Sequence, residues 1–273
     1  MTTLAGPLVL VGCGKMGSAL LRGWLAVGLP AREAYAVEPE ATARERLRER
    51  HGIVALAEAK DLPVELAPRA IVLAVKPQAM AGVLPAYQRL AQSGAVILSI
   101  AAGTTIARLE AAFGTATPVV RAMPNTPAAI GKGVAVLVAN RHASDTQKAL
   151  CHGLMAAVGE VHWTGDEELM HAITAMSGGG PAYVFLLIEA LARAGIASGL
   201  PDALAWPLAR ATVAGSGALA AISDEPVEIL RRNVTSPGGT TQAALGVLMA
   251  ESGIQPLFDQ AIAAATARSR ELA

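Results

Sequence analysis

The stretch of residues 8–26 constrains the fold of this chain more than any other. Leu8–Val11 is a short apolar run typical of a buried strand, and residues 18–26 have the pattern of a helix. Between them the spacing of glycines is G-x-G-x-x-G, which in this strand–turn–helix setting is the fingerprint of a dinucleotide-binding turn. Such a turn predicts that the following residues contact a dinucleotide: Gly12, Cys13, Gly14, Lys15, Met16 and Gly17.

An acidic residue follows the next predicted strand, residues 35–37. Glu38 lies 21 positions after Gly17, where a carboxylate hydrogen-bonds the adenosine ribose 2′-hydroxyl. A carboxylate there repels a 2′-phosphate, so Glu38 favours NADH over NADPH. The alternative is that Glu38 only caps the next predicted helix, residues 42–50.

Further apolar runs at residues 69–75 and 95–100 predict central parallel strands. Ligands of such sheets bind beyond the carboxyl ends of the strands. Asn125, which follows another short apolar run, is predicted to reach the nicotinamide side. Lys76 is either a charge at the cofactor edge or a solvated lysine at a strand end. The residues predicted to edge the cofactor are Ala74, Val75, Lys76, Pro77, Ala101, Ala102 and Gly103.

The pattern of the chain changes after Trp163. Strand and helix patterns alternate over residues 1–163, which predicts an α/β domain with a doubly wound, Rossmann-like sheet. Residues 164–273 are helical throughout and predict an all-helical second domain. Residues 184–198 are apolar nearly all round, so we expect them to be buried on every side. A second subunit would provide that cover, which predicts a homo-oligomer.

Composition and charge exclude several classes of function. Lysine and arginine together equal aspartate and glutamate, and no basic run is present, which argues against nucleic-acid binding. No apolar run reaches the roughly 18–20 residues of a membrane span. Residues 1–11 lack the charged start of a signal peptide, so a cytoplasmic location is expected. Five scattered histidines and two cysteines show no metal-ligand spacing, so no metal site is predicted.

Residues 233–241, NVTSPGGTT, interrupt the helical half. Pro237 cannot continue a helix, and the two glycines after it permit unusual backbone conformations. Thr240 or Thr241 is predicted to cap a new helix, whose N-terminus would offer N–H groups to a carboxylate or phosphate. The alternative is a plain turn between two helices.

Five stretches together resemble pyrroline-5-carboxylate reductases, and the resemblance runs over nearly the whole chain. They are GCGKMG, AVKP, RAMPNTPA, SGGGPAY and NVTSPGGTT, of which the last two are the specific ones. The resemblance implies reduction of the cyclic imine Δ1-pyrroline-5-carboxylate to L-proline with NADPH or NADH, the last step of proline biosynthesis. It also implies a homodimer through C-terminal helices, often assembled further into a decamer.

The same resemblance implies roles for residues of the helical half. Asn233 would face the cofactor, and Glu167 would lie near the substrate ring nitrogen. Thr241 and Glu167 are the candidate catalytic residues, with an acid at a helix N-terminus as the alternative for Glu167. This chain departs from the family at Gly179, where a serine is common, and at Glu38. The residues implied to bind the substrate are Ser236, Gly238, Gly239, Thr240 and Thr241.

Two other functions compete with this one. A β-hydroxyacid dehydrogenase shares the glycine-rich turn, but it needs a lysine base in its helical domain, and residues 170–222 contain no lysine. A protein that senses NAD(H) without turnover would leave the threonine pair without a substrate to hold.

Overall fold

The computed structural model describes residue 4 and residues 6–273, which form two compact units. The first unit comprises the chain up to Gly178 together with Ala265–Ala273, and the second comprises Gly179–Ala264. The expected domain division at residues 163 and 164 concerns domains rather than contact clusters, and it stays a prediction.

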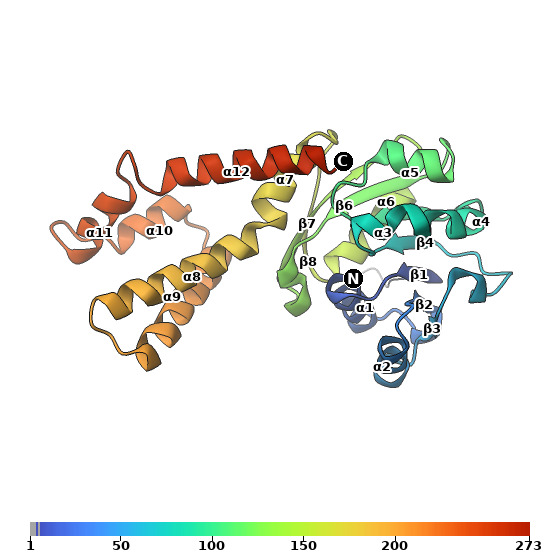
Figure 1. Ribbon diagram of the computed structural model, residues 1–273, viewed down its shortest axis with the longest axis horizontal. Coiled ribbons are helices and arrows are strands. Elements are labelled where there is room, and N and C mark those ends of the chain that lie inside the picture. The colour runs from blue at the N-terminus through green and yellow to red at the C-terminus, as the bar shows by residue number, and fades with distance from the viewer. Residues whose placement is uncertain (1–3, 5) are drawn as a thin grey trace. The chain divides into compact units, whose positions relative to one another are not determined.

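The first unit is built on an eight-stranded mixed sheet (Figure 1). Its strand order is β3-β2-β1-β4-β5-β6-β7-β8, so the order reverses beside β1 as in doubly wound folds. Pairing is parallel except between β6 and β7. The Rossmann-like sheet is therefore confirmed. The strands are β1 Leu8–Val11, β2 Ala34–Val37, β3 Val54–Leu56, β4 Ala70–Leu73, β5 Val96–Ser99, β6 Val119–Met123, β7 Gly133–Ala139 and β8 Gly159–Trp163.

Helices cover both faces of this sheet (Figure 1). Side chains alternate along a strand, so Leu8 and Leu10 of β1 face one core, and Val9 and Val11 face the other. Helices α1, α2 and α6 pack on the first core, and α3, α4 and α5 on the second. The helices are α1 Lys15–Ala26, α2 Ala41–His51, α3 Pro77–Val83, α4 Gln88–Ala91, α5 Ile106–Phe113, α6 Asp145–Ala156 and α7 Leu169–Ile173.

Short helical turns join these elements. In the described part of the chain, four are 3₁₀ turns, and the fifth is a π-helical turn, η5 Thr174–Gly178, which follows α7 directly. The π turn leads into the glycine-rich stretch that begins at Ser177. The 3₁₀ turns are η1 Ala31–Glu33, η2 Ala59–Asp61, η3 Leu84–Tyr87 and η4 Thr126–Ile130.

The second unit is helical throughout its described length. Helix α8 packs along α9, and the rings of Tyr183 in α8 and Phe258 in α12 meet edge to face at 6.3 Å. The last residues of α12, from Ala265, belong to the first unit. The helices are α8 Gly180–Ala197, α9 Asp202–Ile222, α10 Val227–Asn233, α11 Thr240–Leu248 and α12 Ile254–Glu271.

Helix α8 is largely exposed in the single chain. Only Ala192 is buried along its length, and Phe185 and Leu186 are 59% and 61% exposed. The single chain alone does not bury residues 184–198 on every side, and their burial against a second subunit stays a prediction. Its own chain covers one stripe of the helix and leaves the rest open.

One helical stretch also passes the length and composition test for a membrane span. Within Leu169–Ala197, an 18-residue window has a mean hydropathy of 1.4, and 11% of that window is buried. The expectation that no apolar run reaches that length is therefore wrong. A helix that packs against protein has the same length and composition.

Candidate functional site

The glycine-rich turn between β1 and α1 has the shape that its spacing predicts. Gly12 has a φ of +88°, which favours glycine, and Gly14 is the N-cap of α1 without a side-chain cap. A Cβ on Gly17 would lie 2.2 Å from the Gly12 carbonyl oxygen, so only glycine fits there. A Cβ on Gly14 would meet nothing within 4 Å. The turn therefore leaves open space and free N–H groups at the start of α1.

Glu38 lies against this turn. Its Oε2 accepts a hydrogen bond from the Cys13 N–H at 2.9 Å, and its Oε1 accepts one from the Glu40 N–H at 3.1 Å. The alternative that Glu38 caps the following helix is wrong, because Glu40 is the N-cap of α2. Burial, with a smaller contribution from Glu38, raises the pKa of the Cys13 thiol to about 12, so this thiol stays neutral.

The carboxyl ends of β4 and β5 lie beside the end of β1 at one edge of the sheet, because the three strands are parallel neighbours. Beyond β4, Ala74 lies next to Gly12, and Lys76 is the exposed N-cap of α3, whose first residue is Pro77. Beyond β5, Gly103 has a φ of +71°. A Cβ there would lie 2.5 Å from the Leu272 carbonyl oxygen. The C-terminal residues of the chain therefore pack on this loop.

Asn125 is buried and bonded within its own chain. Its Oδ1 accepts from the Val134 N–H at 3.0 Å, and its Nδ2 donates to the Ser177 carbonyl at 3.3 Å. The side chain thus ties the end of β6 to β7 and to the π turn. Its predicted contact with the nicotinamide stays a prediction.

Glu167 is held by two partners in the first unit. Its Oε1 forms an ion pair with the Arg121 guanidinium and accepts a hydrogen bond from the Ile106 N–H at 2.8 Å. Ile106 is the first residue of α5, so Glu167 is indeed an acid at a helix N-terminus, but the helix is not its own. Sequence reasoning missed Arg121. The available signal was a lone arginine in an otherwise apolar strand.

Two buried hydroxyls near these residues also went unnoticed in the sequence. Thr104 Oγ1 follows the β5 loop, and Ser177 Oγ lies in the π turn. Neither has a hydrogen-bond partner within the part of the chain that the structure describes. A buried hydroxyl without a hydrogen-bond partner destabilises the fold, so both hydroxyls are candidates for a hydrogen bond to a ligand.

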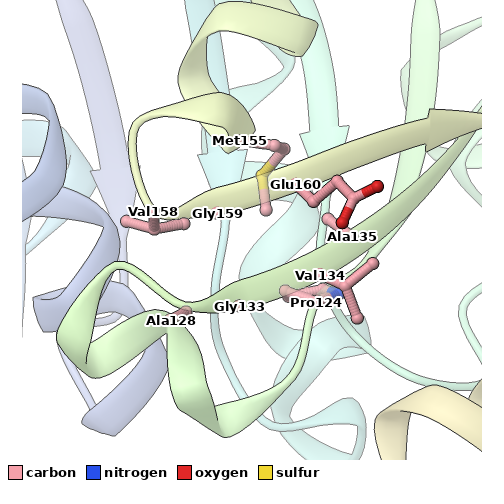
Figure 2. Close-up of a pocket in the computed structure, with 9 residues that line it drawn as sticks. All are labelled: Pro124, Ala128, Gly133, Val134, Ala135, Met155, Val158, Gly159 and Glu160. Atoms are coloured by element: carbon pink, nitrogen blue, oxygen red, sulfur yellow. The ribbon is translucent and has the colours of Figure 1, made fainter. Parts of the chain in front are cut away.

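Figure 2 shows a small hollow at the far end of the same sheet, between β7, β8, α6 and η4. Its lining is apolar except for Glu160, and no set of polar groups converges in it. It lacks the few placed polar groups that distinguish a ligand site, so the hollow is not a candidate. Its lining residues are Pro124, Ala128, Gly133, Val134, Ala135, Met155, Val158, Gly159 and Glu160.

The threonine-rich turn of the second unit departs from the sequence prediction at its cap. Helix α11 begins at Thr240 with Gly239 as the N-cap and no side-chain cap, so the prediction that Thr240 or Thr241 caps it is wrong. Gly238 has a φ of +71°. Its N–H donates to Gln242 Oε1 at 2.5 Å, and the Gly239 N–H donates to the Ser236 carbonyl at 3.1 Å.

The open donors of this turn include the N–H groups of the two threonines. The Thr240 and Thr241 N–H groups donate to no other residue that the structure describes. Asn233, at the end of α10, is exposed and donates from Nδ2 to Glu225 Oε2 at 3.2 Å. These residues belong to the second unit, whereas the glycine-rich turn, Glu38 and Glu167 belong to the first. Between residues 6 and 273, no three His, Cys, Asp or Glu side chains are placed to hold a metal ion.

Known proteins match this chain in both halves. Residues 167–272 match the family described as pyrroline-5-carboxylate reductase dimerisation, and residues 7–103 match one described as NADP oxidoreductase, coenzyme F420-dependent. A pyrroline-5-carboxylate reductase of Pseudomonas aeruginosa is 40% identical over 97% of this chain and 96% of its own length. One from Pisum sativum is 35% identical over 96% of this chain and 94% of its own.

Solved structures agree with these sequence matches. A pyrroline-5-carboxylate reductase of Coxiella burnetii superposes with a TM-score of 0.92 at 33% identity, over 98% of each chain. One from Plasmodium falciparum, solved with NADP bound, superposes with a TM-score of 0.82 at 31% identity, over 97% of each chain. The likeness spans the sheet and the helical half alike, and this chain belongs to the pyrroline-5-carboxylate reductase family.

Proposed function

We propose that this protein reduces the C=N bond of Δ1-pyrroline-5-carboxylate to L-proline by hydride transfer from NAD(P)H. The observation that carries the proposal is the full-length match to reductases of that name at up to 40% identity. The β-hydroxyacid dehydrogenase alternative lacks its lysine base. A nucleotide sensor without turnover is the alternative that an activity measurement excludes.

The glycine-rich turn is the proposed binding site for the cofactor pyrophosphate. The uncapped start of α1 and the open space at Gly14 fit such a group, because it can approach the backbone and accept from free N–H groups. The strand ends at 74–77 and 101–103 would edge the rest of the cofactor, with Asn125 and Asn233 toward its nicotinamide. Glu38 lies at the end of β2 and would accept from the ribose 2′-hydroxyl, which favours NADH.

The N-terminus of α11 is the proposed anchor for the substrate carboxylate. Its N-cap is a glycine, and the open N–H groups of Thr240 and Thr241 can donate hydrogen bonds to an anion. The Gly238 and Gly239 N–H groups are used within the turn, so those glycines shape the anchor rather than donate. The hydroxyls of Ser236 and Thr241 complete the proposed contacts. Thr241 Oγ1 is the side-chain atom that we expect first to contact the substrate.

The chemistry required of the chain is mainly positioning. A protonated imine already carries an electrophilic carbon at C5, and the bound cofactor supplies the hydride. The chain holds the two reactants in position for the transfer. The implied role of Glu167 at that nitrogen stays a prediction. Its Oε1 is shared between Arg121 and Ile106, so its present contacts support a role in holding the β5–α5 loop.

The helical half is the proposed dimer interface, through which two copies of the chain would form a homodimer. The matched dimerisation family covers residues 167–272, and large apolar side chains of α8 and α9 are exposed in the single chain. Assembly into a decamer and a cytoplasmic location stay predictions.

Loss of NAD(P)H absorbance tests the proposed function. Purified protein is mixed with Δ1-pyrroline-5-carboxylate and either NADH or NADPH, and proline is measured as the product. Turnover with at least one cofactor is expected. A protein that binds NADH but shows no turnover with either cofactor is the sensor of the alternative, and the proposed reaction is then wrong.

A further inference from the structure

The turn between β2 and α2 carries a second carboxylate beside Glu38. We propose that Glu38 and Glu40 together exclude the 2′-phosphate of NADPH, and that Glu40 does so by occupying the N-terminus of α2 with an anion of its own. The inference rests on the dinucleotide site of the proposed function. It makes this chain specific for NADH, whereas the Plasmodium falciparum relative was solved with NADP bound.

The position of Glu38 sets where the adenosine ribose would lie. Its carboxylate bridges the Cys13 N–H of the glycine-rich turn and the Glu40 N–H of the next turn. Both oxygens are therefore fixed at the carboxyl end of β2, where the ribose hydroxyls of a dinucleotide meet a Rossmann-like sheet. A phosphate on the 2′-oxygen would be brought against this carboxylate.

Glu40 fills the donors that a 2′-phosphate would otherwise use. Its Oε1 accepts from the Thr42 N–H at 2.9 Å, and its Oε2 accepts from the Ala43 N–H at 2.6 Å. The Thr42 hydroxyl lies 2.7 and 2.8 Å from the same two oxygens and shares its single hydrogen between them. A helix N-terminus attracts anions, and here the anion is already part of the chain.

The charge on Glu40 is maintained by these bonds. Hydrogen bonds from the Thr42 hydroxyl, then from the Thr42 N–H, hold the pKa of the Glu40 carboxyl below its ordinary value. Glu40 is therefore ionised near neutral pH. A 2′-phosphate carries between one and two negative charges near neutral pH, so the two anions repel each other.

The neighbouring arginines are committed to the turn itself. Arg44 Nη1 donates to the Glu38 carbonyl at 2.9 Å and to the Pro39 carbonyl at 2.7 Å. Arg46 Nη2 lies 3.7 Å from Glu40 Oε2. Removing the Glu40 carboxylate would release Arg46 and at least one of the two α2 N–H groups that it binds, and each would then favour a phosphate.

A substitution that keeps the helix cap separates charge from folding. Serine is a preferred N-cap residue, so Glu40→Ser retains a cap on α2 while it removes the anion. Glu49→Gln, near the other end of the same helix, removes one exposed charge without touching the turn. Glu38→Ser removes the proposed ribose contact.

Titration calorimetry with adenosine 5′-monophosphate and adenosine 2′,5′-bisphosphate tests the inference without any turnover. The wild-type protein should bind the monophosphate more tightly than the bisphosphate. Glu40→Ser should raise the affinity for the bisphosphate about tenfold and keep the affinity for the monophosphate within about twofold of wild type. Glu49→Gln should match wild type. Glu38→Ser should weaken the monophosphate and tighten the bisphosphate, and kcat/KM for NADPH over NADH should rise in both turn variants.

Three results would overturn the inference. One is tighter wild-type binding of the bisphosphate than of the monophosphate. Another is a folded Glu40→Ser variant whose bisphosphate binding equals that of Glu49→Gln, because Glu40 would then be a helix cap only. The third is no binding of either nucleotide. Failure to reduce the imine, with nucleotide discrimination intact, would instead contradict the proposed function and leave this inference standing.

Discussion

Glycines of the same motif meet different surroundings at the scale of single residues, and so their substitutions should fail differently. A Cβ on Gly17 would lie 2.2 Å from the Gly12 carbonyl, and backbone cannot easily give way there. Gly17→Ala should therefore lower the free energy of unfolding by about 1–3 kcal/mol. Gly14→Ala meets open space, so its stability should equal wild type while its affinity for NADH falls about tenfold or more. Thermal unfolding and NADH titration measure the two effects. Unchanged NADH affinity in Gly14→Ala would remove this turn as the pyrophosphate site.

The Thr241 hydroxyl should matter for the substrate and little for the cofactor. Thr241→Val keeps the shape of the side chain but removes the hydroxyl, and Thr241→Ser keeps the hydroxyl. A hydrogen bond to a charged group contributes about 1.5–3 kcal/mol, so Thr241→Val should raise KM for the imine about tenfold or more. The serine variant should stay near wild type, as should KM for NADH in both. Steady-state kinetics with each substrate varied in turn checks this. Equal KM values in both variants would remove Thr241 from the proposed anchor.

Both cysteines should be inert in the folded protein. Burial raises the pKa of Cys13 and of Cys151 from 9.0 to about 12, with a smaller contribution from Glu38 at Cys13. At about pH 8 iodoacetamide should therefore label neither thiol until the chain is unfolded in urea.

The raised pKa of the two thiols also predicts how the stability of the fold changes with pH. Below pH 9.0 both states hold the proton, and between 9.0 and about 12 only the unfolded thiols lose it, so stability falls as the pH rises. Rapid labelling of folded protein, read by mass spectrometry, would contradict the burial.

At the scale of elements, the Arg121–Glu167 ion pair joins β6 to the segment before α7, and Glu167 also accepts a hydrogen bond from the first residue of α5. The Arg121 side chain is 4% exposed and that of Glu167 31%, so removing one partner leaves a buried charge unpaired. Glu167→Ala should lower the free energy of unfolding by about 3–5 kcal/mol, and the double variant Arg121→Met with Glu167→Leu should recover much of that loss. Urea unfolding measures both.

The glutamine variant separates this structural role from one at the ring nitrogen. Glu167→Gln keeps an acceptor for the Ile106 N–H but removes the charge. If Glu167 only holds the loop, the midpoint of urea unfolding falls and the pH profile of kcat keeps its shape. A profile displaced toward lower pH would assign the charge to the ring nitrogen instead, because the protonated imine would have lost a stabilising anion.

The elements that could be predicted from the sequence are those with a local signal. Apolar runs bounded by glycine, proline and charged residues placed β1 and β2 within a residue of their observed bounds. The antiparallel direction of β7 has no such local signal, because hydrophobic periodicity does not encode strand direction. The Arg121–Glu167 pair joins residues 46 positions apart and has no local signal either. The predicted cap of α11 was wrong because Gly239, which has no side chain, is the N-cap residue. Both threonines therefore lie inside the helix.

At the scale of the whole molecule, the second unit is incomplete as a single chain. Helices α8 and α9 expose Leu186, Trp206, Leu208 and Ile222 to between 39% and 82%, although their composition is that of a protein core. The sequence predicted the need for cover and assigned that cover to a second subunit. Burial is a property of the assembly, so a helix that packs against a second copy has the same pattern as one that packs inside its own chain.

A charge placed on α8 should therefore dissociate the protein without unfolding the sheet. Leu186 is 61% exposed in the single chain and lies within the matched dimerisation segment, so Leu186→Asp would bury a charge in the proposed interface. Val64 is 77% exposed in the first unit, and Val64→Asp is the matched control. Light scattering after size exclusion should give wild type and the control a mass of at least twice the 27.8 kDa chain, and Leu186→Asp a mass near that of one chain.

Because the partner stabilises the folded chain by mass action, the Tm of wild type should rise with protein concentration and that of Leu186→Asp should not. The dissociated variant should still bind adenosine 5′-monophosphate, since the glycine-rich turn lies wholly in the first unit. A wild-type protein that elutes as a single chain at every concentration would rule out the proposed dimer.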